Sequence, residues 1–79
     1  MNYDRAISEA IFAYLGAQQM TLAELARDSG ISERTLLRRL KFGLWSVNES
    51  LDVAHGLHIT LTELATAAEQ LQAEHEEAL

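Results

Sequence analysis

Three short segments of the 79-residue sequence share one pattern, in which Ser or Thr is followed three positions later by Glu. They are TLAE at 21–24, SVNE at 46–49 and TLTE at 60–63. In such a capping box the hydroxyl accepts a hydrogen bond from the third backbone N–H of a helix, and the Glu carboxylate accepts one from the capping residue. Each segment precedes a run of apolar residues with helical spacing, so three helices are predicted to begin at these positions.

Two further helices follow from the same spacing. Apolar residues between Ile7 and Leu15 recur three and four positions apart, as they do along one side of a helix, and Phe12 lies off this stripe. Ser32 is a fourth N-cap candidate, ahead of another amphipathic run. The sequence has no proline to interrupt these runs. It predicts an all-α, five-helix bundle with helices at about 4–18, 21–29, 32–42, 46–55 and 60–76.

Three glycines are predicted to mark helix ends. Gly30, Gly43 and Gly56 each follow an amphipathic run, where a residue with left-handed backbone angles often closes a helix. Trp45, between two of the predicted helices, is expected to anchor beside the helix at 46–55.

The composition indicates one small domain, taken as residues 1–79. With 48% hydrophobic residues the chain is expected to be globular. Neither a membrane-spanning run nor a signal-peptide pattern is visible. The absence of cysteine excludes disulfides and thiolate metal sites and fits a cytoplasmic protein.

Positive charge is confined to one stretch of this acidic chain, whose net charge is −6. The segment 27–41 holds five basic and two acidic residues, a net charge of +3, whereas the remainder holds one basic and ten acidic residues, a net charge of −9. Because charges act mainly at close range in salt, the segment can form a local basic face on an acidic protein. The five basic residues are Arg27, Arg34, Arg38, Arg39 and Lys41.

The segment DSGIS, between the second and third predicted helices, indicates a tight turn. Gly30 suits a positive φ, Ala26 is small enough to let two helices cross closely, and Ile31 supplies an apolar contact at the turn. Two helices joined in this way form a helix-turn-helix.

The stretch LAELARDSGISERTLLRRL resembles the DNA-reading unit of the Cro/repressor-type helix-turn-helix proteins, the Xre-like family that includes phage Cro and immunity repressors. The similarity continues through WSVNESLDVAHGLHITLTEL and covers about residues 5–70. It implies a lambda-repressor-like domain that binds double-stranded DNA and acts as a transcriptional repressor or regulator. RTLLRRLKFG is one residue longer than the equivalent segment of many members, and the chain is more acidic than is usual for a DNA-binding protein.

The resemblance implies that the start of the helix at 32–42 reads bases in the major groove. Arginine can donate two parallel hydrogen bonds to guanine, a carboxylate can accept from cytosine, and an apolar side chain can contact the thymine methyl group. The candidates for base readout are Ser32, Glu33, Arg34, Leu37 and Arg38, with a core position as the alternative for Leu37. The candidates for phosphate contacts are Thr21, Arg39, Lys41, Ser46 and Asn48.

The last predicted helix carries an apolar stripe of Leu64, Ala68 and Leu71. Two copies of the stripe would form the seam of a weak homodimer, and Phe12 is a second apolar candidate for such a contact. The alternative is that Leu61, Leu64 and Ala68 complete the core of a single copy.

Other functions have less support in the sequence. His55 and His58 are three positions apart, but no third ligand completes a metal site. No nucleophile stands beside a base and no phosphate-binding loop is present, so neither an enzyme, a cofactor nor a small-molecule ligand is expected. Two alternatives to a phage or bacterial repressor stay open: the antitoxin of a toxin–antitoxin pair, and a protein-interaction module on a helix-turn-helix scaffold.

Overall fold

A computed structural model describes residues 1–78 of the chain, with side chains through Glu76. The only regular secondary structure in this part is α-helix, and the prediction of an all-α, five-helix bundle is confirmed. The helices are α1 (Tyr3–Gln18), α2 (Leu22–Ser29), α3 (Glu33–Phe42), α4 (Val47–Gly56) and α5 (Leu61–Ala78). None of the described helices combines the length and the apolar content needed to cross a bilayer.

Side-chain caps fix where these helices begin. In the first predicted box the Thr21 hydroxyl accepts from the Glu24 backbone N–H at 3.1 Å, and the Glu24 carboxylate accepts from the Thr21 backbone N–H at 3.0 Å. The boxes at 46–49 and 60–63 form in the same way. The hydrogen bond from the Thr21 backbone is the main reason that the pKa of Glu24 is lowered from its ordinary value. All three predicted capping boxes are therefore confirmed.

Two of the three predicted glycine ends are confirmed, since Gly30 has φ 78° and Gly43 has φ 70°. The prediction for Gly56 is wrong. Gly56 lies in the last turn of α4, and the left-handed residue after that helix is His58, with φ 61°. A Cβ atom at Gly56 would lie 2.9 Å from the Cδ1 of Leu25 and 2.9 Å from the backbone nitrogen of Ser29. Glycine is needed there because α4 packs directly against α2.

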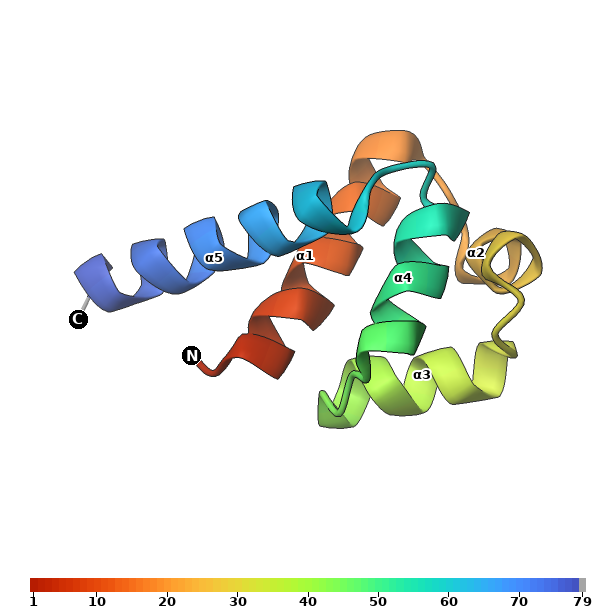
Figure 1. The fold of residues 1–79 in the computed structure, drawn as a ribbon, viewed down its shortest axis with the longest axis horizontal. Coiled ribbons are helices and arrows are strands. Elements are labelled where there is room, and N and C mark those ends of the chain that lie inside the picture. The colour runs from red at the N-terminus through yellow and green to blue at the C-terminus, as the bar shows by residue number, and fades with distance from the viewer. Residues whose placement is uncertain (79) are drawn as a thin grey trace.

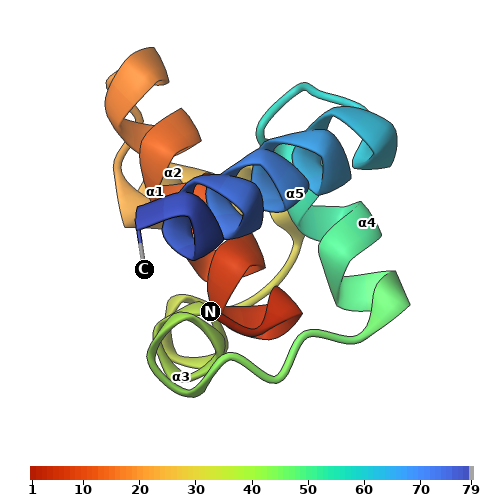
Figure 2. The same ribbon diagram turned by 90° about the vertical axis from the view of Figure 1, so that its left-hand side faces the viewer.

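The core lies around α1, which packs against α5 on one side and against α3 on the other (Figures 1 and 2). The packed pair of α2 and α4 closes the remaining side of the bundle. The fully buried large side chains come from all of these helices and from the turn after α4: Ile11, Leu25, Leu36, Val53, Leu57 and Leu64.

Trp45 is held by α1 as well as packed near α4, which the sequence did not predict. Its indole Nε1 donates to the Ser8 hydroxyl at 2.9 Å, and its backbone N–H donates to the Asp4 carboxylate at 3.3 Å. Ser8 is 2% exposed, so the indole supplies the hydrogen-bond partner that a buried hydroxyl needs. Trp45 therefore ties the connection between α3 and α4 to the first helix.

The predicted dimer seam does not lie on the surface. Leu64 and Ala68 are both 0% exposed, and Leu71 is half-buried against the same core. The physical reason is the long contact between α1 and α5, which covers this stripe within one copy. The alternative reading of Leu64 and Ala68, as residues that complete the core, is the correct one.

The close approach at Gly56 yields a stability prediction. We expect Gly56→Ala to lower the free energy of unfolding by about 1–3 kcal/mol, because the added methyl group meets backbone atoms of α2 that cannot move cheaply. Urea unfolding followed by circular dichroism measures the change. The matched control is Gly16→Ala, where the new Cβ meets nothing within 4 Å inside α1. That variant should be more stable by about 0.5–1 kcal/mol. Equal unfolding curves for Gly56→Ala and the unaltered protein would contradict the packing described.

Candidate nucleic-acid interface

α3 divides into a buried side and an exposed side. Leu36 is 0% exposed and Leu40 is 7% exposed, and both belong to the core. Leu37 is 55% exposed, so its alternative as a core leucine does not hold. The predicted base-reading residues and Lys41 all lie on the exposed side of α3 or at its N-cap: Ser32, Glu33, Arg34, Leu37, Arg38 and Lys41.

The turn before α3 has the expected geometry. The Gly30 backbone N–H donates to the Ala26 carbonyl at 3.0 Å, and the Ile31 backbone N–H donates to the Ser29 hydroxyl at 3.2 Å. Ala26 and Ile31 are half-buried and pack against the core. α2, the turn and α3 thus form a helix-turn-helix that presents α3 at one edge of the molecule (Figure 1).

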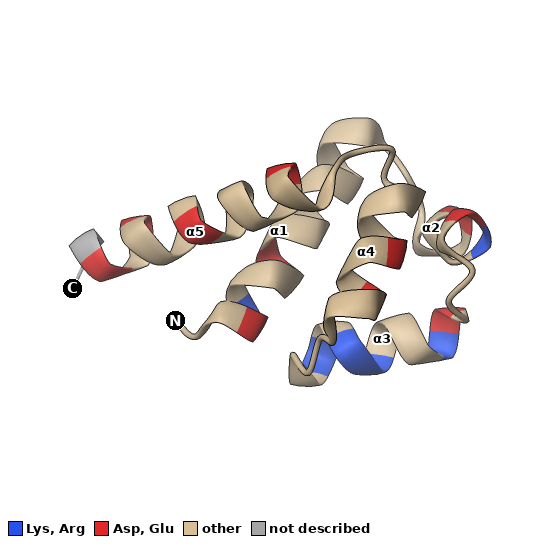
Figure 3. Ribbon diagram, viewed as in Figure 1, with Lys and Arg blue, Asp and Glu red and all other residues tan. Residues whose placement is uncertain are grey.

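The charges separate in space as well as in sequence. Figure 3 shows Lys and Arg along α3 and at the end of α2, while α4 and α5 carry Asp and Glu. The exposed side of α3 holds Arg34, Arg38 and Lys41, with Glu33 at its first turn. A phosphate strand that approaches the molecule therefore meets attraction on this edge and repulsion from α4 and α5.

The arginines differ in whether a carboxylate already holds them. Arg5 Nε lies 3.2 Å from Glu9, Arg27 Nε lies 3.0 Å from Asp28, and Arg39 Nε lies 2.9 Å from Glu49. Within the part of the chain whose side chains are described, the other two arginines, Arg34 and Arg38, form neither an ion pair nor a side-chain hydrogen bond. Their guanidinium groups are therefore free to donate to an external acceptor.

Arg39 was expected to contact a phosphate, and the structure instead places it between α3 and α4. It donates to the Glu49 Oε2, while the Oε1 of the same carboxylate accepts from the Ser46 backbone N–H at 3.2 Å. Both partners are more than two-thirds buried along their side chains. The hydrogen bond from Arg39 is the main reason that the pKa of Glu49 is lowered. Nothing in the sequence signals this pair, because Arg39 and Glu49 belong to different helices.

The N-cap hydroxyls among the candidates are all engaged in their caps. Ser32 accepts from the Thr35 backbone N–H at 3.2 Å and donates to the Thr35 hydroxyl at 2.9 Å. Thr21 and Ser46 are exposed, but the Glu of each capping box places a carboxylate at the same helix start. A carboxylate in that position competes with a phosphate for the positive end of the helix. Asn48, in the first turn of α4, is exposed and keeps its side chain free of such a cap.

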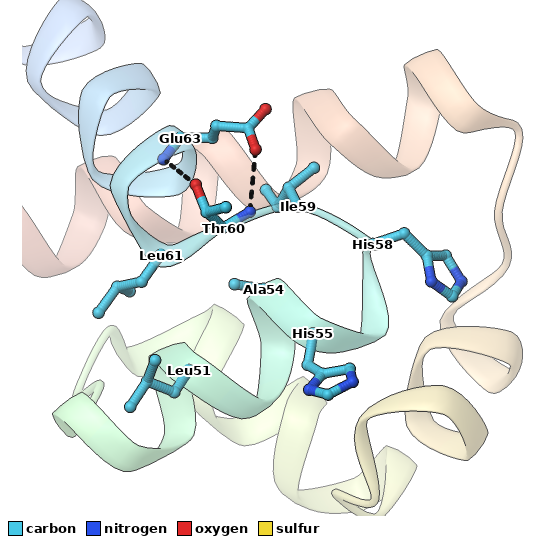
Figure 4. A pocket seen from close by; sticks show the side chains of 8 residues that line it. All are labelled: Leu51, Ala54, His55, His58, Ile59, Thr60, Leu61 and Glu63. Carbon is cyan, nitrogen blue, oxygen red and sulfur yellow. Dashed lines mark hydrogen bonds between the residues drawn. The ribbon is translucent and has the colours of Figure 1, made fainter.

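The two histidines of the sequence prediction do not converge on one site. Both border a hollow of about 460 Å³ between α4 and the start of α5, and Figure 4 shows their rings pointing in different directions. The Glu63 carboxylate there accepts from the Thr60 backbone N–H (Figure 4). His58 Nε2 lies 3.7 Å from the Asp28 carboxylate, on α2. Across the described residues, no group of three or more His, Cys, Asp or Glu side chains is arranged to hold a metal ion.

The Arg39–Glu49 pair gives a pH-dependent stability prediction. A carboxylate with a lowered pKa in the folded state stabilises the fold above its unfolded pKa of about 4.3, and that contribution is lost as the pH falls through the lower, folded value. We therefore expect Glu49→Gln to cost about 1 kcal/mol at neutral pH and progressively less in acid. Urea unfolding at pH 7 and at pH 3 measures both differences.

The matched control is Glu63→Gln, which alters the same capping position in α5 without an arginine partner. Gln also serves in a capping box, so this variant should stay close to the unaltered protein. A loss for Glu49→Gln that persists undiminished at pH 3 would mean that the charge of Glu49 is not what stabilises the contact.

Comparison with known families agrees with this architecture. The family described as helix-turn-helix, Psq domain matches residues 4–44, just over half of the chain, from α1 to two residues beyond the end of α3. Comparisons with curated proteins and with solved structures gave no match. The family match supports a DNA-binding helix-turn-helix and does not single out the Cro/repressor type. On the strength of its first three helices and the turn between the second and third, the chain belongs to the helix-turn-helix family of the Psq domain.

Proposed function

We propose that the protein is a sequence-specific regulator of transcription, a repressor of phage or bacterial type, that inserts α3 into the major groove of double-stranded DNA. The observation that carries the proposal is the exposed side of α3, where two unpaired arginines lie opposite the buried Leu36 and Leu40. An α-helix fits the major groove, where base edges present distinct patterns of donors and acceptors. In this proposal residues 1–79 act as one DNA-binding domain.

The first two contacts assigned to bases are those of Arg34 and Arg38. They are four positions apart, so they lie one helical turn from each other on the same side of α3. Each guanidinium can donate to O6 and N7 of a guanine. Glu33 is proposed to accept from a cytosine, and the exposed Leu37 is proposed to contact a thymine methyl group. The Ser32 hydroxyl already accepts a hydrogen bond in the cap of α3. Ser32 is therefore proposed to help base readout by fixing the exposed start of this helix.

The phosphate contacts are proposed at Lys41 and at the starts of α2 and α4. Lys41 lies at the exposed C-terminal end of α3, with its ammonium 5.6 Å from the centre of the Phe42 ring. Thr21, Ser46 and Asn48 remain candidates because all three residues are exposed, and the side-chain amide of Asn48 can donate to a phosphate. Arg39 is no longer proposed as a phosphate contact, because it holds α3 against α4 through Glu49. Lys41 is the phosphate contact proposed on α3.

The acidic surface outside residues 27–41 is proposed to favour binding to specific DNA sites over random DNA. Outside 27–41 the chain carries a net charge of −9, much of it on α4 and α5 (Figure 3). At physiological salt, charges act over about 8 Å, so this surface repels a DNA backbone that lies close to it. The attractive edge is then presented to DNA in one orientation. We expect weaker binding to random sequences than a uniformly basic domain would give.

A second candidate is binding to another protein, as in an antitoxin or an interaction module. The observation in its favour is the set of exposed apolar side chains between the end of α3 and the start of α4, where Phe42 and Leu44 are each 66% exposed and Val47 is 70% exposed. Exposed apolar patches of this kind often mark contacts with other proteins. An antitoxin would use both this surface and α3, whereas a pure interaction module would not bind DNA.

Selection from a random duplex library, followed by sequencing, tests the proposal. Recovery of a shared motif is the expected result, and its symmetry reports whether one or two copies bind. A titration with random duplex DNA at several salt concentrations separates the two candidates. A pure interaction module would give no salt-dependent binding, and that result would overturn the proposed function.

The two unpaired arginines give a specific prediction. Arg34→Ala and Arg38→Ala should each weaken binding to the selected site by about 1–3 kcal/mol and relax the preference at one base position. Lys41→Ala should weaken binding to selected and random DNA equally, because a phosphate contact carries no sequence information. Gel-shift titrations on both duplexes measure these losses. Equal losses on the two duplexes for the arginine variants would place both residues among the phosphate contacts.

A further inference from the structure

Arg5 is the one basic residue that lies outside the segment 27–41, and the fold brings it to the basic edge. Arg5 in α1 and Lys41 at the end of α3 border the same groove between the two helices, although 36 positions separate them in the sequence. They also border a second hollow of about 300 Å³ beside the N-terminus. The basic surface of the protein therefore extends from α3 onto α1.

The groove has a volume of about 530 Å³ and is bordered by α1 on one side and by α3 on the other. α1 contributes Arg5, Glu9 and Phe12, and α3 contributes Leu37, Leu40 and Lys41. Leu37 and Lys41 also belong to the exposed side of α3, so the groove opens beside the surface proposed to face the bases. Phe12 is 53% exposed and Leu37 is 55% exposed, which leaves two apolar side chains facing the same space without cover.

This combination of groups matches the chemistry of a DNA strand. A sugar–phosphate backbone alternates an anion with a mostly apolar deoxyribose, and the groove offers two cations next to two apolar side chains. Glu9 already pairs with the Nε of Arg5 at 3.2 Å, with the two side chains 63% and 40% exposed. An ion pair this exposed is weak, so the terminal N–H groups of Arg5 can still donate to a phosphate.

The position of the protein groove beside α3 also agrees with the dimensions of DNA. The major groove is about 12 Å wide, and a helix with its side chains is about 10–12 Å across. When a helix fills the major groove of DNA, the two DNA strands that border this groove come into contact with the protein elements on either side of the helix. Along the side of α3 that bears Leu37 and Lys41, the neighbouring element is α1.

We infer that the groove between α1 and α3 holds the backbone of one DNA strand, with Arg5 and Lys41 at adjacent phosphates and Phe12 against deoxyribose. The inference rests on the proposed insertion of α3 into the major groove and adds α1 to the DNA-binding surface. It also accounts for Phe12, which neither the core nor the helix-turn-helix uses.

The test is the salt dependence of binding to a mixed-sequence duplex, measured by fluorescence anisotropy with the full chain. Each phosphate contact contributes about 0.9 to the slope of log affinity against log salt. Arg5→Ala should reduce the magnitude of that slope by about this amount, and Arg5→Lys should restore it. Phe12→Ala should weaken binding at every salt concentration and leave the slope unchanged, because it removes an apolar contact.

The matched control is Gln70→Glu, which changes the net charge by the same amount as Arg5→Ala but lies on α5, across α1 from α3 (Figures 1 and 2). It should leave the slope almost unchanged, and circular dichroism melts establish that all variants fold. If the unaltered protein shows salt-dependent binding while Arg5→Ala keeps the full slope, the inference is overturned and the groove is left to a protein partner. If the unaltered protein does not bind the duplex at all, the proposed function itself has failed.

Discussion

The burial of Leu36 and Leu40 in the core determines how α3 is presented. Both side chains point into the bundle, so Leu37, Arg38 and Lys41 are turned to the outside of the molecule. One helix therefore serves two purposes: its apolar side closes the core, and its basic side is available to a ligand. A rotation of α3 about its own axis would bury Arg38 and expose Leu36, and burial of an unpaired guanidinium is costly enough to prevent it.

Two contacts fix the frame in which α3 lies. At Gly56 the absence of a side chain lets α4 lie against α2, the first helix of the helix-turn-helix. At Glu49 one carboxylate both caps α4 and accepts from Arg39, which joins the end of α3 to the start of α4. α4 is therefore attached to both halves of the helix-turn-helix. Because the match to the Psq domain ends at residue 44, this support comes from a part of the chain beyond the family's own segment.

The features that the sequence predicted correctly are those that depend on neighbouring residues. A capping box joins positions three apart, and the positive φ of Gly30 belongs to a single turn. The features it missed join parts of the chain that are distant in sequence. Arg39 with Glu49, Trp45 with Ser8 and the role of Gly56 depend on how the helices and their connections pack.

The apolar stripe of α5 illustrates the same limit for surfaces. Its spacing correctly indicated that one side of the helix is covered, but spacing cannot say whether the cover comes from the same copy or from a second one. α1 provides that cover, so Leu64 and Ala68 are core residues. In the candidate site, the exposed side of α3 followed from periodicity, whereas the approach of Arg5 to Lys41 required the packing of α1 against α3.

The most direct test of DNA binding through α3 is an amide chemical-shift titration of the full chain with a mixed-sequence DNA duplex. We expect the largest changes on α3, on the turn at Gly30 and on the first half of α1, while the exposed side of α5 stays unchanged. Changes concentrated on α4 and α5 with none on α3, or no changes at all, would contradict the claim that α3 is the DNA-binding element of this protein.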